Sequence, residues 1–147
     1  MNHASEVVIR LFVAIDQRDW LQVKNCFAPQ VELDYSSMTG QPAAVLSPTE
    51  IIQSWKGILP GFEHTHHQLG NFITAADERS AHVFCYGTAT HFLPDEGGNL
   101  WTVVGSYDFG LSKDEAGNWK VAKMKFNFKY QDGNTNLPEK AMAKLKR

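Results

Sequence analysis

The chain has 147 residues, of which 43% are hydrophobic and 20% charged, and its formal net charge is -2. This length fits one domain with its own core, and the nearly balanced charge argues against a surface for nucleic acid or anionic membranes. No basic segment followed by an apolar run opens the chain, and no stretch reaches the ~20 apolar residues of a membrane span. Cys26 and Cys85 have no metal or redox spacing, so we expect free thiols in a cytoplasmic protein.

Three amphipathic helices are predicted in the first 60 residues. Apolar residues recur at helical spacing over 4–18, and Asp19 can cap a second helix over 20–27. The sequence Ser-Pro-Thr-Glu at 47–50 combines a capping residue, a first-turn proline and a glutamate, and therefore opens a third helix. Between the second and third helices, the alternation at 31–35 predicts a short strand.

The chain after the third helix is strand-like. Segments 63–76, 80–93, 100–112 and 118–130 are separated by turn signals. Four such strands in succession form an antiparallel meander, and helices followed by a sheet are typical of the α+β class. We therefore expect a single α+β domain over residues 1–135, in which N-terminal helices close a curved antiparallel sheet into a cone around one pocket.

Two expectations concern the surface. Residues 136–147 are expected to form a basic tail outside the domain, and the lysine-rich part of it, 139–147, reads as a solvated helix. The last two strands carry apolar residues on both faces, whereas a sheet covered by helices on one side is normally wetter on the other. We therefore expect the outer face to pack on a second subunit, in a homodimer or higher homo-oligomer. An unusually aromatic surface is the alternative.

Asp16 is the first candidate for chemistry. It follows Val8 and Phe12 at four-residue spacing, which places it on the buried stripe of the first helix. A buried carboxylate is costly unless it is paired or hydrogen-bonded, so Asp16 requires a partner. The alternative is that it contacts the backbone at the helix end.

Histidines supply candidate partners. Alternation puts His64 and His66 on one face of their strand and His67 on the other. This split argues against a zinc site, which needs three or four convergent ligands. His91 shares its face of the next strand with small and apolar residues, as expected where a sheet curves around a cavity. A core histidine with satisfied hydrogen bonds is the alternative there.

Further residues complete the candidate pocket. Tyr35 ends the first strand, and Ser106 and Asp108 share one face of a later strand, where they indicate either a pocket wall or a wet face. No Walker loop, nucleophile elbow, Gly-rich dinucleotide turn or Cys-x-x-Cys motif occurs, which argues against nucleotide and redox chemistry. We expect the substrate to contact Ser106 and Asp108 together with Trp55, Met124, Phe126 and Phe128.

Several short segments follow one another in a characteristic order over roughly residues 5–130. They are Asp16-Gln17-Arg18-Asp19-Trp20, Phe27-Ala28-Pro29, Val31-Glu32-Leu33-Asp34-Tyr35, Thr65-His66-His67-Gln68-Leu69-Gly70-Asn71, Thr90-His91 and Asn118-Trp119-Lys120-Val121. Their order resembles the nuclear-transport-factor-2-like superfamily, which has a cystatin-like fold, and in particular its SnoaL-like and scytalone-dehydratase-like branch.

The resemblance implies a dyad in which Asp16 pairs with His67. It also places Tyr35 and His91 on the family's carbonyl-side tyrosine and second histidine. Ile15 stands where the family has a tyrosine, and Asp108 stands where fungal scytalone dehydratase has an asparagine. These departures argue against the fungal melanin substrate and leave the dyad in place. No metal or organic cofactor is implied.

Such a dyad predicts acid–base chemistry. A carboxylate on one ring nitrogen fixes the tautomer and makes the other nitrogen more basic. His67 can then remove a proton α to a carbonyl, while Tyr35 or His91 polarises that carbonyl or assists the leaving group. We predict a cofactor-independent dehydratase for a small cyclic or aromatic hydroxy-ketone. The alternatives are isomerase or polyketide-cyclase chemistry in the same pocket, and a non-catalytic small-molecule-binding module.

Overall fold

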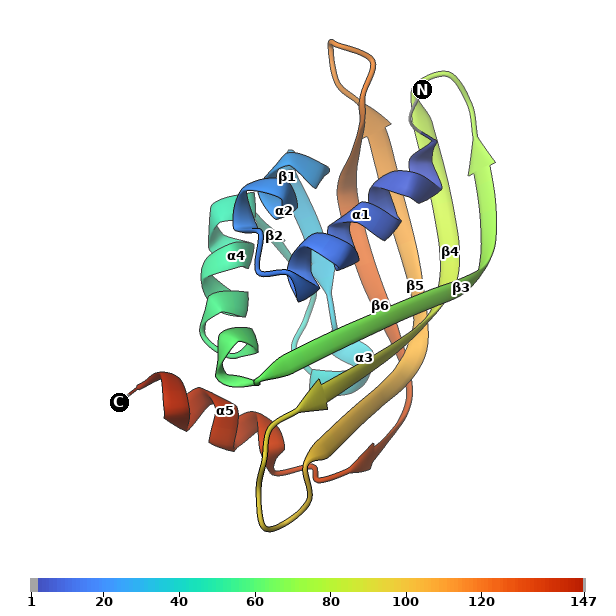
Figure 1. Ribbon diagram of the computed structural model, residues 1–147. Coiled ribbons are helices and arrows are strands. Elements are labelled where there is room, and N and C mark those ends of the chain that lie inside the picture. The colour runs from blue at the N-terminus through green and yellow to red at the C-terminus, as the bar shows by residue number, and fades with distance from the viewer. Residues whose placement is uncertain (1–2, 147) are drawn as a thin grey trace.

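The computed structural model describes residues 3–146 and confirms the α+β class (Figure 1). Its strands are β1 (Phe27–Asp34), β2 (Ala44–Leu46), β3 (His64–Ala76), β4 (Ser80–Phe92), β5 (Leu100–Lys113) and β6 (Trp119–Gly133). They form one mixed sheet in the order β2-β1-β6-β5-β4-β3. β3 to β6 pair antiparallel in chain order, as predicted. β1 differs from the expectation, because it pairs parallel with β6 and antiparallel with β2.

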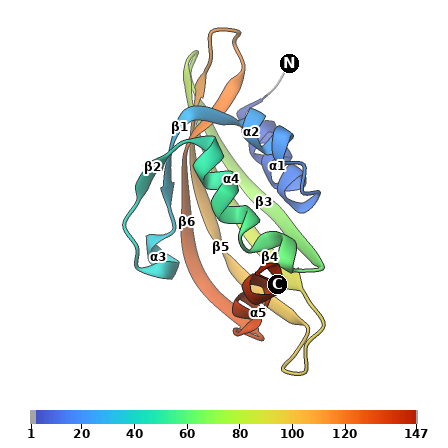
Figure 2. The same ribbon diagram turned by 90° about the vertical axis from the view of Figure 1, so that its left-hand side faces the viewer.

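Helices cover the concave side of this sheet (Figure 2). The helical elements are α1 (Ala4–Asp16), α2 (Trp20–Cys26), α3 (Ser36–Thr39), α4 (Pro48–Lys56), the 3-10 turn η1 (Leu59–Gly61) and α5 (Leu137–Leu145). The predicted start of α4 is present: Ser47 Oγ accepts the N–H of Glu50 at 3.2 Å, and the Glu50 carboxylate accepts the N–H of Ser47 at 3.0 Å. This capping box satisfies two donors that a helix start leaves open.

The core lies between α1 and the concave face. Val8 and Leu11 of α1 are fully buried, and so are Phe109 of β5 and Met124 of β6. Because side chains of a strand alternate between faces, the residues next to Phe109 along β5 and next to Met124 along β6 point away from the helices. The core therefore fixes which face of β5 and β6 is available to a cavity.

The C-terminal segment 136–146 is packed on the domain, and the helix expected to be solvated over 139–147 is buried at Ala141. Leu137 and Ala141 of α5 are 0% exposed. Gly61 of η1 touches the backbone of Ala141 so closely that a Cβ at this position would overlap it. A salt bridge of 2.6 Å between Lys140 Nζ and Asp95 Oδ1 also ties α5 to the turn after β4. α5 is thus part of the fold.

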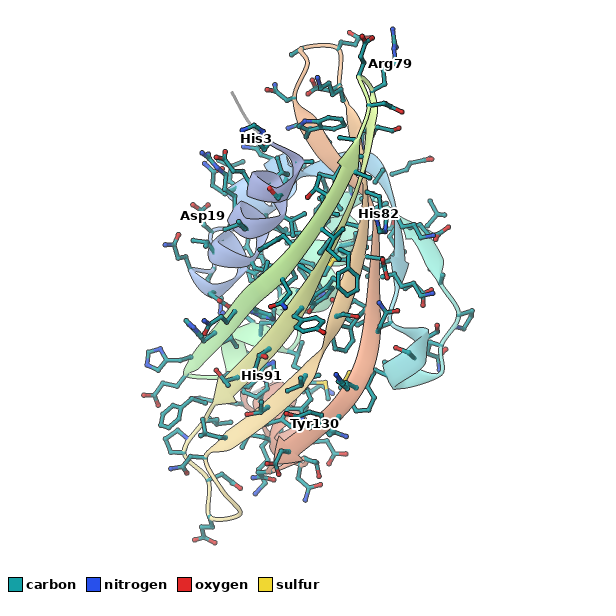
Figure 3. All side chains as sticks on the ribbon, turned by 90° about the vertical axis from the view of Figure 1, so that its right-hand side faces the viewer. His3, Asp19, Arg79, His82, His91 and Tyr130 are labelled. Atoms are coloured by element: carbon teal, nitrogen blue, oxygen red, sulfur yellow. The ribbon has the colours of Figure 1, made fainter. Side chains whose placement is uncertain are left out.

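The convex outer face of the sheet mixes polar and apolar side chains. Figure 3 looks onto this face, where His82 Nε2 lies 2.9 Å from Asp108 Oδ1, within hydrogen-bond distance. Tyr86 is half-exposed and Val104 partly buried on the same face. The expected contact with a second subunit stays a prediction. Within residues 3–146, no helix has the length and hydrophobicity needed to cross a membrane.

Candidate active site

A cavity of about 330 Å³ opens between the helices and the concave face of the sheet. Its volume is in the range of small-molecule sites, which are mostly apolar with a few polar groups. Its wall is largely aromatic and aliphatic, and among residues 3–146 no Lys, Arg, Asp or Glu lines it. The predicted site residues that line it are Tyr35, Trp55, His67, His91, Met124 and Phe126.

Ser106 and Asp108 do not line the cavity, contrary to the prediction. Tyr107 and Phe109 occupy the core-facing positions of β5, so the intervening residues point outward. Asp108 pairs there with His82 and accepts a hydrogen bond from Asn127 Nδ2 at 2.8 Å. Strand alternation alone does not show which face of β5 is exposed to solvent, and the structure puts Ser106 and Asp108 on the outer face.

Phe128 is the third predicted substrate contact that the structure contradicts. It lines a separate depression of about 270 Å³ on the outer face, together with Ser106. The β5–β6 register shifts between Val104 and Gly105, which marks a β-bulge in β6 beside Phe128. Phe126 and Phe128 are both in regular register with β5, and the bulge begins only beyond Phe128, so the bulge does not turn Phe128 away from Phe126. Phe128 is partly buried against the core but does not line the cavity.

Asp16 and His67 form the contact that the resemblance implied. His67 Nδ1 lies 2.7 Å from Asp16 Oδ1, and the backbone N–H of His67 donates to Asp16 Oδ2 at 2.7 Å. Since an ionised carboxylate only accepts, Nδ1 carries the proton. This leaves Nε2, on the other edge of the ring, available to a molecule in the cavity. α1 and β3 therefore hold an oriented imidazole at the cavity wall.

Sequence reasoning missed two residues that support this pair. The hydroxyl of Thr65, two positions before His67, donates to Asp16 Oδ1 at 3.0 Å. Arg18 Nη1 donates to Thr65 Oγ1 at 2.7 Å, and Nη2 donates to Leu59 O at 2.7 Å. A guanidinium has no acceptor, so the Thr65 proton is directed to Asp16. Alternation in β3 could have found Thr65, because it shares the face of His67.

Arg18 could not have been found by pattern. It adopts a positive φ of 58°, which is uncommon for a residue with a side chain. This conformation turns the chain directly after α1 and lets its side chain reach both β3 and η1. Only the folded chain brings these three segments together.

The electrostatics of Asp16 favour the charged form. Burial alone would raise the pKa of this carboxyl, but the hydrogen bonds and the charge of His67, with a further bond from Thr65, outweigh burial and lower the pKa below its usual value. Asp16 is therefore ionised near neutral pH and can stabilise a protonated His67.

The surroundings of His91, in contrast, favour its uncharged form. It is 5% exposed, and its Nδ1 donates to the backbone oxygen of Trp101 at 2.9 Å. Burial lowers the pKa of His91 to about 4, although the Trp101 bond acts in the other direction. The ring is thus neutral near pH 7, with a lone pair on Nε2. In this form His91 can accept a hydrogen bond through Nε2 but cannot donate one to a carbonyl. Of the two roles expected from the resemblance, assistance of the leaving group therefore remains and polarisation of the carbonyl does not.

No metal-binding group is found in the described part of the chain. Among residues 3–146, no three His, Cys, Asp or Glu side chains lie close enough to hold a metal ion. The arrangement present is a base, an acceptor and phenolic donors around an apolar cavity. These groups can move a proton and bind oxygen atoms of a small molecule.

The model of the SnoaL-like domain family matches residues 3–125. The chain belongs to this family. SnoaL-like domains are part of the nuclear-transport-factor-2-like superfamily, so the predicted membership is confirmed. A comparison with curated proteins gave no match.

Solved structures show that this SnoaL-like chain shares its fold with distant proteins. A protein from Kribbella flavida has 23% identity and a TM-score of 0.86, covering 92% of this chain and 94% of its own. A candidate scytalone dehydratase from Novosphingobium aromaticivorans has 18% identity, a TM-score of 0.76 and coverages of 88% and 83%. A hexachlorocyclohexane dehydrochlorinase has 12% identity, a TM-score of 0.74 and coverages of 88% and 84%. At these identities the similarity establishes the fold alone.

Proposed function

We propose that this SnoaL-like protein is a cofactor-independent lyase, a dehydratase for a small, uncharged, cyclic or aromatic hydroxy-ketone. The observation that carries the proposal is the 2.7 Å contact between His67 Nδ1 and Asp16 Oδ1 at the wall of an apolar cavity. A non-catalytic carrier needs the cavity but not an oriented imidazole with an ionised partner. Two of the distant structural neighbours are candidate dehydratases, which agrees with this proposal.

The proposed reaction begins with proton abstraction. His67 Nε2 takes the proton α to the substrate carbonyl, and the electron pair moves onto the carbonyl oxygen as an enolate. The hydroxyl of Tyr35, which lines the cavity, donates to that oxygen. The enolate then re-forms the carbonyl and a carbon–carbon double bond while the β-hydroxyl leaves. The leaving oxygen takes the proton from His67, so that one water is released and the base is regenerated.

In the proposed reaction, His91 orients the hydroxyl group that leaves. Neutral His91 presents Nε2 as an acceptor, because Nδ1 is occupied by Trp101 O. A substrate hydroxyl can donate to that nitrogen, and this contact orients the hydroxyl for departure. Within residues 3–146 the cavity wall has no Lys or Arg to bind a carboxylate or phosphate, which favours an uncharged substrate.

The test is the substitution His67→Ala, assayed against a panel of cyclic and aromatic hydroxy-ketones. Loss of a general base should reduce turnover by about 10²- to 10⁴-fold. His66→Ala is the matched control, since His66 is exposed on the opposite face of β3 and should leave turnover unchanged. Undiminished turnover in His67→Ala would refute the mechanism.

Product analysis separates dehydration from the other reactions that the same groups can perform. Only dehydration gives a product that has lost water, whereas isomerisation conserves the substrate formula. A carrier would show no turnover, and its ligand affinity should hardly change in Asp16→Asn. Saturable binding with no reaction of any bound hydroxy-ketone would favour the carrier.

A further inference from the structure

Tyr107 has a feature that the mechanism above does not use. It lies in the middle of β5, is 5% exposed and lines the cavity. A buried tyrosine normally pairs its hydroxyl, yet no residue among 3–146 forms a hydrogen bond with the Tyr107 hydroxyl. Every fully buried side-chain nitrogen or oxygen in these residues has a hydrogen-bond partner, so the Tyr107 hydroxyl is not fully buried. The hydroxyl therefore opens onto the cavity, where a ligand can reach it.

The Tyr107 ring is held firmly in place. Its centroid lies 5.1 Å from that of Phe12 and 5.0 Å from that of Phe126. On β4, Gly87 leaves room for the ring, since a Cβ there would lie 2.9 Å from Tyr107 Cδ2 and closer still to Cε2. The position of the hydroxyl is thus set by packing before any ligand enters, which is the condition for effective electrostatic stabilisation.

The same two aromatic neighbours connect Tyr107 to the proposed catalytic groups. Phe12 also packs on His67, with ring centroids 5.0 Å apart, and Phe126 packs on Tyr35 at 5.8 Å. Burial raises the pKa of both tyrosines, so both hydroxyls stay protonated and can donate. The cavity therefore holds two phenolic donors together with the imidazole of His67.

We propose that Tyr107 is a further catalytic residue, whose hydroxyl joins that of Tyr35 in a two-donor site for the carbonyl oxygen of the substrate. This inference rests on the proposed function, because the site is most useful when negative charge develops on that oxygen during proton abstraction. The ligand class is an enolate or a phenolate: a planar, apolar ring that carries an oxygen anion. Hydrogen bonds to such an anion are stronger than bonds to a neutral carbonyl.

The test is equilibrium binding of 4-nitrophenolate, followed by its visible absorbance at a pH where the probe is ionised. Tyr107→Phe removes the donor and keeps the ring, and should weaken binding by about 10- to 100-fold, as expected for a hydrogen bond to a charged group. Tyr86→Phe loses an equivalent hydroxyl on the outer face and should bind as the wild type does. Near-UV circular dichroism shows whether each variant keeps its packing.

A second variant covers the case in which Tyr107→Phe does not fold. Replacement of Tyr107 by 3-fluorotyrosine makes the phenol more acidic at nearly constant shape, and should tighten 4-nitrophenolate binding several-fold. Absent binding by the wild type, or affinities within about twofold of it in both Tyr107 variants, would overturn the proposal. Probe binding needs no turnover, so binding through Tyr107 in a protein that dehydrates nothing would refute only the proposed function.

Discussion

At the scale of single residues, the Asp16 carboxylate is held by more than its histidine. Oδ1 receives the Thr65 hydroxyl and His67 Nδ1, and Oδ2 receives the His67 backbone N–H. Arg18 acts at one remove, because it donates to Thr65 Oγ1 and so orients the hydroxyl. Charge-assisted bonds of this kind fix the direction of the carboxylate, and through it the ring of His67.

Thr65→Val tests this support. The substitution removes one donor to Asp16, so the pKa of Asp16 should rise toward its ordinary value. A lowered carboxyl pKa adds stability above the unfolded pKa, and this stability is lost as pH falls through the folded pKa. The variant should therefore lose about 1–3 kcal/mol of unfolding free energy at neutral pH. A ¹³C titration of the Asp16 carboxyl measures the pKa directly.

Thr65→Ser is the control for that titration, because it keeps the hydroxyl and removes only a methyl group. It should titrate much like the wild type. If the valine variant titrates like the wild type as well, Thr65 contributes packing alone and the orienting role is wrong.

His91 gives the protein a predicted acid sensitivity. The pKa of His91 is lowered from 6.5 to about 4 in the folded chain, so the unfolded chain takes up a proton first as pH falls. Stability is therefore complete above about pH 6.5 and declines down to about pH 4, by at most about 1.4 kcal/mol per pH unit. Urea unfolding at pH 7 and pH 5 measures this slope. His91→Gln should have a shallower slope, and an equal slope would assign the acid sensitivity to other groups.

At the scale of elements, strong local signals were sufficient for most of the fold. The capping box before α4 and the turns between the long strands are local features, and the structure contains them. α3 and β2 were missed because they are only 4 and 3 residues long. α3 depends on a distant contact: Ser37 Oγ donates to Phe126 O and accepts the N–H of Phe128, both at 2.8 Å. Short elements of this kind are stabilised by tertiary contacts that no local pattern contains.

The candidate site was predictable where residue spacing within a single helix or strand determines which side chains face the core. Helical spacing placed Asp16 on the buried stripe, and strand alternation separated His67 from His66. Alternation along β5 was ambiguous by itself, since it groups residues without saying which group is buried. The aromatic set that includes Tyr107 takes the core face, because it buries more apolar area than the set that includes Asp108. Strand alternation does not separate Phe128, which packs on the core outside the cavity, from Phe126, which lines the cavity.

At the scale of the whole molecule, the C-terminal helix is connected to the Asp16–His67 pair through a series of contacts. α5 packs against η1, where Gly61 meets Ala141. The carbonyl of Leu59 in η1 accepts a bond from Arg18, which also holds Thr65. α5 therefore supports the segment that carries one end of the Arg18 side chain, although α5 itself does not line the cavity.

Leu137→Ala measures how much the domain depends on this helix. Leu137 is 0% exposed, and truncation of a fully buried leucine lowers the unfolding free energy by about 2–5 kcal/mol. Leu145→Ala is the matched control in the same helix, since Leu145 is 39% exposed and should lose under about 1 kcal/mol. Urea denaturation of both variants gives the comparison. Similar small losses would mean that α5 detaches readily in solution, and that η1 and Arg18 are held without it.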